Sequence, residues 1–75
     1  MQGGLVVVRD FAGNPRLARV YSDRGAVVDV CSALPGKAIG DDGKPLPPIG
    51  VRRDDVFRYT EELLRTGNWD AARPL

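Results

Sequence analysis

Two turn signals divide the first 31 residues of the chain into three short runs that are rich in β-branched side chains. The first run, residues 5–11, stops at Gly13-Asn14-Pro15, and the second run, residues 16–21, stops at Ser22-Asp23-Arg24-Gly25. The third run covers residues 26–31. Short turns of this kind join antiparallel neighbours, and a glycine supplies the left-handed conformation that such a loop needs. The pattern predicts an antiparallel meander over about residues 5–31.

The first of these strands, Leu5 to Arg9, is apolar on both faces. An apolar strand at the edge of a sheet is a template for pairing with another chain. We therefore regard this strand as a candidate for edge-to-edge pairing. The second run alternates instead, with Leu17, Arg19 and Tyr21 on one face of the sheet.

The stretch from residue 34 to residue 50 is rich in proline and glycine, which excludes regular structure over much of it. Its segment Pro45-Leu46-Pro47-Pro48 contains a PxxP spacing, which aromatic grooves of partner domains can bind. We favour a rigid connector over such a ligand. Asp41 and Asp42 are interpreted as solvated turn residues.

A short fourth strand over residues 51–53 and a helix over about residues 55–66 are expected next. Spacings of 1, 3 and 4 residues place five side chains on one helical face: Val56, Phe57, Thr60, Leu63 and Leu64. Asp54 or Asp55 is suited to cap the start of this helix, and Gly67 is suited to end it.

The order of elements predicts an α+β fold in one domain, residues 1–75. We expect a small antiparallel β-meander of three to four or more strands with one C-terminal α-helix packed on it. An SH3-like curled sheet or barrel is one form that this meander can take. The expected parts are the meander at about 5–31, the Pro/Gly-rich loop at 34–50, a short strand and helix at about 51–66, and a tail at 67–75.

Composition excludes several kinds of chemistry. The 75 residues include no His and one Cys, so His-based acid–base catalysis, Cys/His metal sites and internal disulfides are excluded. Ser22 and Ser32 have no base close in sequence, and neighbouring carboxylates such as Asp54 and Asp55 diverge by about 100° on a helix. We expect no enzyme activity, no catalytic residue, no metal and no cofactor.

Size and cysteine use indicate a compartment and an assembly state. A chain this short supplies a net stability of only about 3–5 kcal/mol, so self-association as a homodimer is a reasonable expectation. Cys31 has no partner within the chain, which suits a reducing cytoplasm. No apolar run approaches the roughly 20 residues that cross a bilayer, so we expect no membrane partner.

Nine of the 11 basic residues are arginines, although the formal net charge is only +1. If Arg9 and Arg19 face the same way on adjacent strands, they form with Tyr21 a basic and aromatic platform that binds phosphates and bases. The alternative is that the arginines pair with Asp10, Asp23 and Asp29 on a solvated face. We favour this second interpretation because interspersed acids weaken the field.

Trp69 follows the predicted helix and is equally suited to plug the core or to anchor a partner. Seven side chains are therefore candidates for binding: Arg9, Arg19, Tyr21, Arg24, Arg52, Arg53 and Trp69. The leading hypothesis is a small non-catalytic protein-interaction module that binds a protein partner or itself. The rival hypothesis is a nucleic-acid-binding accessory protein that uses the Arg/Tyr face.

Overall fold

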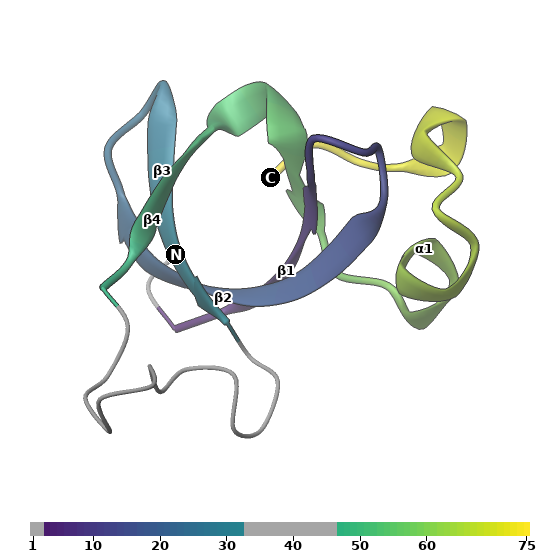
Figure 1. Ribbon diagram of the computed structural model, residues 1–75, viewed down its shortest axis with the longest axis horizontal. Coiled ribbons are helices and arrows are strands. Elements are labelled where there is room, and N and C mark those ends of the chain that lie inside the picture. Colours follow the sequence, from purple (N-terminus) through teal and green to yellow (C-terminus); the bar gives the residue numbers. More distant parts are fainter. Residues whose placement is uncertain (1–2, 33–46) are drawn as a thin grey trace.

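The computed structural model describes residues 3–32 and 47–75, which form a five-stranded antiparallel sheet in the order β4-β3-β2-β1-β5 (Figure 1). The strands are β1 (Leu5–Arg9), β2 (Pro15–Asp23), β3 (Val27–Ser32), β4 (Ile49–Arg52) and β5 (Val56–Arg58). The first three strands are the predicted meander, in which each strand pairs with its neighbour in sequence. The α+β class and the antiparallel meander are thus confirmed.

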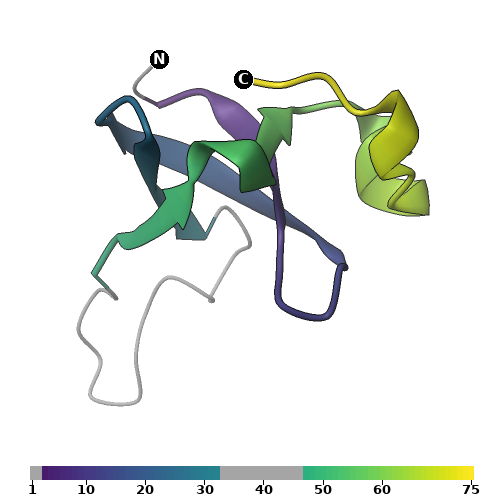
Figure 2. The same cartoon turned by 90° about the horizontal axis from the view of Figure 1, so that it is seen from above.

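The sheet curls strongly, and a single 3-10 turn, η1 (Arg53–Asp55), joins its two outermost strands, β4 and β5 (Figure 1). These two strands form no ladder with each other, so the curled sheet is not a closed barrel. The β1–β2 turn lies at one end of the curl, and the C-terminal residues lie at the other end (Figure 2).

The inside of the curl holds a core made almost entirely of valine. Alternate residues of each strand point inward, and a β-branched side chain packs well against such a pleated surface. Half-buried Val51 and Leu75 pack against this cluster. The buried members are Val6, Val8, Ala18, Val20, Val28, Val30 and Val56.

β1 is buried on its outer face as well. Val7 is fully buried although it points away from the inner core, and it lies opposite Leu17 of β2 and Phe57 of β5. The prediction that β1 is an edge strand open to another chain is therefore wrong. The strand is apolar on both faces because it lies between two strands and is covered from both sides.

The first turn begins earlier than predicted, because β1 ends at Arg9 and does not reach Phe11. The carboxylate of Asp10 accepts hydrogen bonds from the backbone N–H groups of Ala12 and Asn14, at 2.9 and 2.8 Å. This side-chain turn competes with continuation of the strand. The second turn begins later than predicted, because β2 extends through Ser22 to Asp23, but Gly25 takes the expected left-handed conformation with a φ of 85°.

The predicted helix over residues 55–66 is correct only in its second half. Residues 56–58 form β5 against β1, and α1 covers Glu61–Thr66. The hydroxyl of Thr60 caps it by accepting from the N–H of Leu63, whereas Asp54 and Asp55 belong to η1 and cap nothing. The apolar residues whose spacing predicted one helix belong to two elements. Fully buried Val56 is in β5, and buried Leu63 is in α1.

α1 lies outside the curl and packs against β2 (Figure 1). Gly67 ends it in the left-handed conformation, as predicted. The tail then forms a short 3-10 turn, η2 (Trp69–Ala71), and Pro74 bridges back to Phe57. No helix within the described residues is long and apolar enough to cross a bilayer.

The predicted Pro/Gly-rich loop is described only at its end. Residues 34–46 of it, including Asp41, Asp42 and half of the PxxP segment, lie outside the described residues. Ile49 and Gly50 belong to β4, which therefore begins two residues before the predicted strand and ends at Arg52.

Candidate binding surfaces

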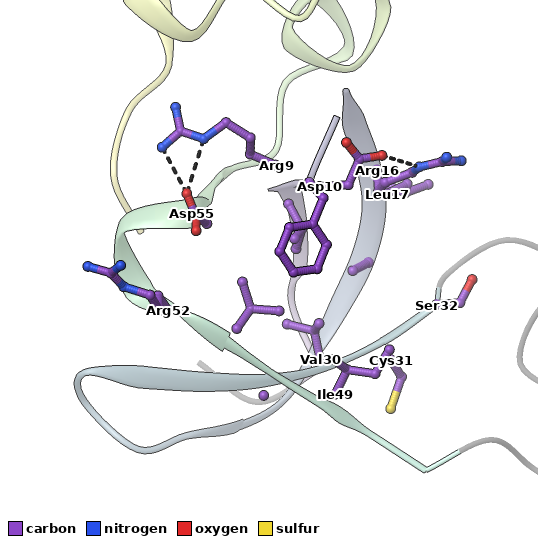
Figure 3. Close-up of a pocket in the computed structure, with 15 residues that line it drawn as sticks. Arg9, Asp10, Arg16, Leu17, Val30, Cys31, Ser32, Ile49, Arg52 and Asp55 are labelled. Atoms are coloured by element: carbon purple, nitrogen blue, oxygen red, sulfur yellow. Dashed lines mark hydrogen bonds and ion pairs between the residues drawn. The ribbon is translucent and has the colours of Figure 1, made fainter. Parts of the chain in front are cut away.

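A pocket of about 670 Å³ opens at the end of the curl that carries the β1–β2 turn (Figure 3). Its floor consists of inward-pointing core residues from four strands, namely Val8, Ala18, Val30 and Val51. Since these side chains are apolar, the pocket favours an apolar occupant over a charged one.

Two exposed apolar side chains border this pocket. Phe11, in the β1–β2 turn, is fully exposed, and Ile49, the first residue of β4, is 67% exposed. Sequence reasoning missed both residues because it placed Phe11 inside a strand and Ile49 inside a loop. The available signal was an aromatic side chain next to a Gly-Asn-Pro turn, where no strand face covers it.

The charged groups at the pocket are paired with one another. Arg9 donates to Asp55 at 2.8 Å, and Arg16 donates to Asp10 at 3.0 Å (Figure 3). The backbone N–H of Asn14, followed by the side chain of Arg16, lowers the pKa of Asp10 below its ordinary value. A carboxylate that already accepts these bonds is a poor proton acceptor for catalysis.

β4 borders the pocket and has an open edge. Hydrogen-bonded and non-hydrogen-bonded pairs alternate along an antiparallel ladder. The N–H of Arg53 donates to the C=O of Ala26 at 2.9 Å, and by register Val51 is the next residue bonded to β3. The backbone groups of Gly50 and Arg52 therefore point away from β3, and no strand of the described residues pairs with them.

Gly50 lies in a closely packed part of this strand, where a Cβ would be 3.3 Å from Cγ1 of Val27. A Cβ at this position would lie 3.4 Å from both the Arg24 guanidinium and the Asp29 carboxylate. These two side chains form an ion pair of 2.8 Å that lies across β4 on the outer face. A Cβ at position 50 would therefore be in van der Waals contact with that pair.

Arg9 and Trp69, two predicted binding residues, serve the fold. The Arg9 guanidinium lies over the rings of Phe57 and Trp69, 5.3 and 5.4 Å from their centroids, while it binds Asp55. The indole N–H of Trp69 donates to the C=O of Gly13 at 2.9 Å. This cluster fastens the tail to the outer face of the sheet.

Three other predicted binding arginines also have acidic partners. Arg24 binds Asp29, as described above, and Arg53 binds Asp23 at 2.7 Å. Arg52 makes a looser pair with Asp54 at 3.8 Å, and both of its members are largely exposed. Arg53 and the N–H of Gly25 lower the pKa of Asp23, in that order of effect.

The predicted platform of Arg9, Arg19 and Tyr21 is not assembled. Arg19 lies opposite Leu5 and Arg9 lies opposite Pro15, so the two arginines are at opposite ends of the β1–β2 ladder. Tyr21 stays with Arg19 on β2 and is 54% exposed. The alternative interpretation is confirmed for the acids, because Asp10, Asp23 and Asp29 each bind an arginine. It is not confirmed for Arg9, which binds Asp55 instead.

Residues 3–32 and 47–75 contain no group of three or more side chains suited to hold a metal ion. The half-buried thiol of Cys31 lines the pocket without a disulfide partner. Comparison of the chain with protein family models, with curated proteins and with solved structures finds no match.

Proposed function

We propose that this chain is a non-catalytic protein-interaction module that pairs with a second copy of itself through the open edge of β4. The observation that carries the proposal is this edge, whose outward backbone groups pair with no described strand and lie next to an exposed Ile49 and an apolar pocket. An edge strand in this setting recruits another strand.

The edge fits a twofold partner. If Val51 lies opposite Val51 of the partner subunit, the outward groups of Gly50 meet those of Arg52 of the partner subunit, and the reverse contact follows by symmetry. Side chains opposite one another are then valine with valine and glycine with arginine, so no two like charges are opposed. Val51 and Ile49 share the inward face, so the second copy extends the apolar wall of the pocket.

The expected association is weak. β4 has only four residues, and two prolines precede it, which limits the length of the new ladder. An interface below about 1,200 Å² belongs to transient assemblies. We expect a monomer–dimer equilibrium between about 10 μM and 1 mM.

Sedimentation equilibrium tests this with two variants at one position. Arg52 has a φ of −58°, which proline adopts without strain, so Arg52→Pro removes the outward N–H and leaves the fold intact. Arg52→Ala removes the same side chain but keeps the N–H. The proposal predicts a dimer for the wild type and for Arg52→Ala, and a monomer for Arg52→Pro.

Two results would overturn the proposal. One is a wild-type chain that stays monomeric up to about 1 mM. The other is a dimer that survives Arg52→Pro, because its interface then lies elsewhere. Circular dichroism of Arg52→Pro must match the wild type, so that loss of the dimer is not loss of the fold.

A further inference from the structure

The arginines of this chain form two groups. Five are in ion pairs, as described above: Arg9, Arg16, Arg24, Arg52 and Arg53. The remaining four, Arg19, Arg58, Arg65 and Arg73, form no ion pair with any residue of the described ranges. All four are exposed. Three of them lie together, and only one of these three was predicted from the sequence.

Register places Arg19 of β2, Arg58 of β5 and Arg73 of the tail at the same end of the sheet, and we call them the arginine row. Arg19 of β2 is opposite Leu5 of β1, and Arg58 of β5 is opposite the adjacent Val6. The N–H of Arg58 donates to the C=O of Arg73 at 2.9 Å, so the tail continues the row. Neighbouring strands are about 4.8 Å apart, which makes the row about 15 Å wide.

By register, the row lies at the end of the β1–β2 ladder away from the β1–β2 turn and the pocket. The C-terminal residues lie at this end of the curl (Figure 2). Arg19 and Arg58 start from opposite faces of the sheet, but the Arg19 guanidinium bends to this end and donates to the C=O of Gly3 at 3.2 Å. Between the two arginines, β1 is preceded by Gly3 and Gly4, whose backbone groups bond to the backbone of Val20 and to the side chain of Arg19.

Two exposed tyrosines lie next to the row in sequence. Tyr21 follows Arg19 on β2 and is 54% exposed, and Tyr59 directly follows Arg58 and is 39% exposed. Arginines bind phosphate oxygens, while aromatic rings stack on bases without regard to their sequence. The combination of three cations and two rings distinguishes this surface from the ion-paired pocket end.

We propose that the arginine row binds the phosphates of a single-stranded nucleic acid, with Tyr21 and Tyr59 stacked on its bases. A single strand is favoured over a duplex because only its bases are free to stack on a side chain. It is favoured over an acidic peptide because a peptide makes no use of the two rings. The nearest acids in sequence are Glu61, three residues after Arg58, and Asp70, three residues before Arg73, and they limit the affinity.

Fluorescence anisotropy with a labelled oligothymidylate of about 15 nucleotides tests the proposal at low salt. Three phosphate contacts predict that log K falls with log salt with a slope of about −2. Replacing any arginine of the row by alanine should weaken binding about two- to fivefold and reduce the slope by about 0.7. Tyr59→Ala should weaken binding about fivefold or more, because a stacked base is lost.

Arg65→Ala is the matched control, since it removes the same charge from an exposed, unpaired arginine on α1. It should leave both the affinity and the slope close to those of the wild type. The proposal is overturned if no binding occurs at about 20 mM salt, or if Arg65→Ala acts like Arg58→Ala. It is also overturned if polyglutamate competes as well as oligothymidylate and Tyr59→Ala has no effect.

Discussion

Arginine side chains have different surroundings at the two ends of the curled sheet. At the pocket end, Arg9 and Arg16 bind Asp55 and Asp10, so their charges are used within the chain. At the opposite end, the arginine row has no acidic partner among the described residues. The exposed side chains at the pocket end that are outside ion pairs include apolar Phe11 and Ile49, whereas those at the other end include the cationic arginine row. A near-neutral chain can therefore carry one apolar and one charged surface, which a net charge of +1 does not reveal.

The largest expected effect comes from the core that holds both ends in place. Val56 is fully buried, and its strand β5 carries Arg58 of the row while η1 before it carries Asp55 of the pocket. Val56→Ala should lower the free energy of unfolding by about 2 kcal/mol, because it removes buried methyl groups and leaves a cavity. Urea denaturation measures this. Val27→Ala, at a half-buried outer position, should cost clearly less.

The next expected effect is a difference in stability between losing an ion pair stacked on aromatic rings and losing an exposed ion pair. Arg9→Ala should cost about 1 kcal/mol, because Arg9 contacts two rings as well as Asp55 and its side chain is only 35% exposed. Arg24→Ala removes the ion pair between Asp29 and Arg24, whose side chain is 59% exposed. It should lower the free energy of unfolding by less than about 0.5 kcal/mol. Equal costs in urea denaturation would contradict the structural role given to Arg9.

The smallest effect is a pH dependence to which each end contributes one carboxylate. The pKa of Asp10 at the pocket end and that of Asp23 at the other end of β2 are both lowered. A lowered folded-state pKa gives stability above the ordinary value of 3.8, and this stability is lost as pH falls through the lowered pKa.

Comparison of the Asp10→Asn and Asp23→Asn double variant with the wild type measures this loss. The variant should lose less stability than the wild type between about pH 5 and pH 2.5 in urea denaturation. Asp70→Asn, which changes an exposed carboxylate without a hydrogen bond to the described residues, should not alter the acid sensitivity. An unchanged acid sensitivity in the double variant would contradict the assigned hydrogen bonds.

The three strands of the meander were predictable because they depend on local alternation and on turns such as that at Gly25. The first half of the predicted helix was not, because its apolar spacing fits both a helix and a strand followed by a helix. Val56 and Phe57 pair with β1 as its second neighbouring strand, because β-branched and aromatic residues favour the extended conformation. Secondary structure here was decided by tertiary pairing.

The arginines illustrate the same limit for the site. That arginines pair with the acids of the meander was predictable from composition. Which arginine pairs with which acid was not, because Arg9 and Asp55 are 46 residues apart and Arg53 and Asp23 are 30 apart. The arginine row likewise depends on register across β2, β1 and β5, which no local pattern encodes.

One amide chemical-shift experiment tests the central claim that the two ends are separate surfaces. A dilution series should shift the amides of Gly50 and Arg52 on the β4 edge. An oligothymidylate titration of the same sample should shift those near Arg19, Arg58 and Arg73. The account predicts two sets of residues that do not overlap, and a shared set of shifts would contradict it.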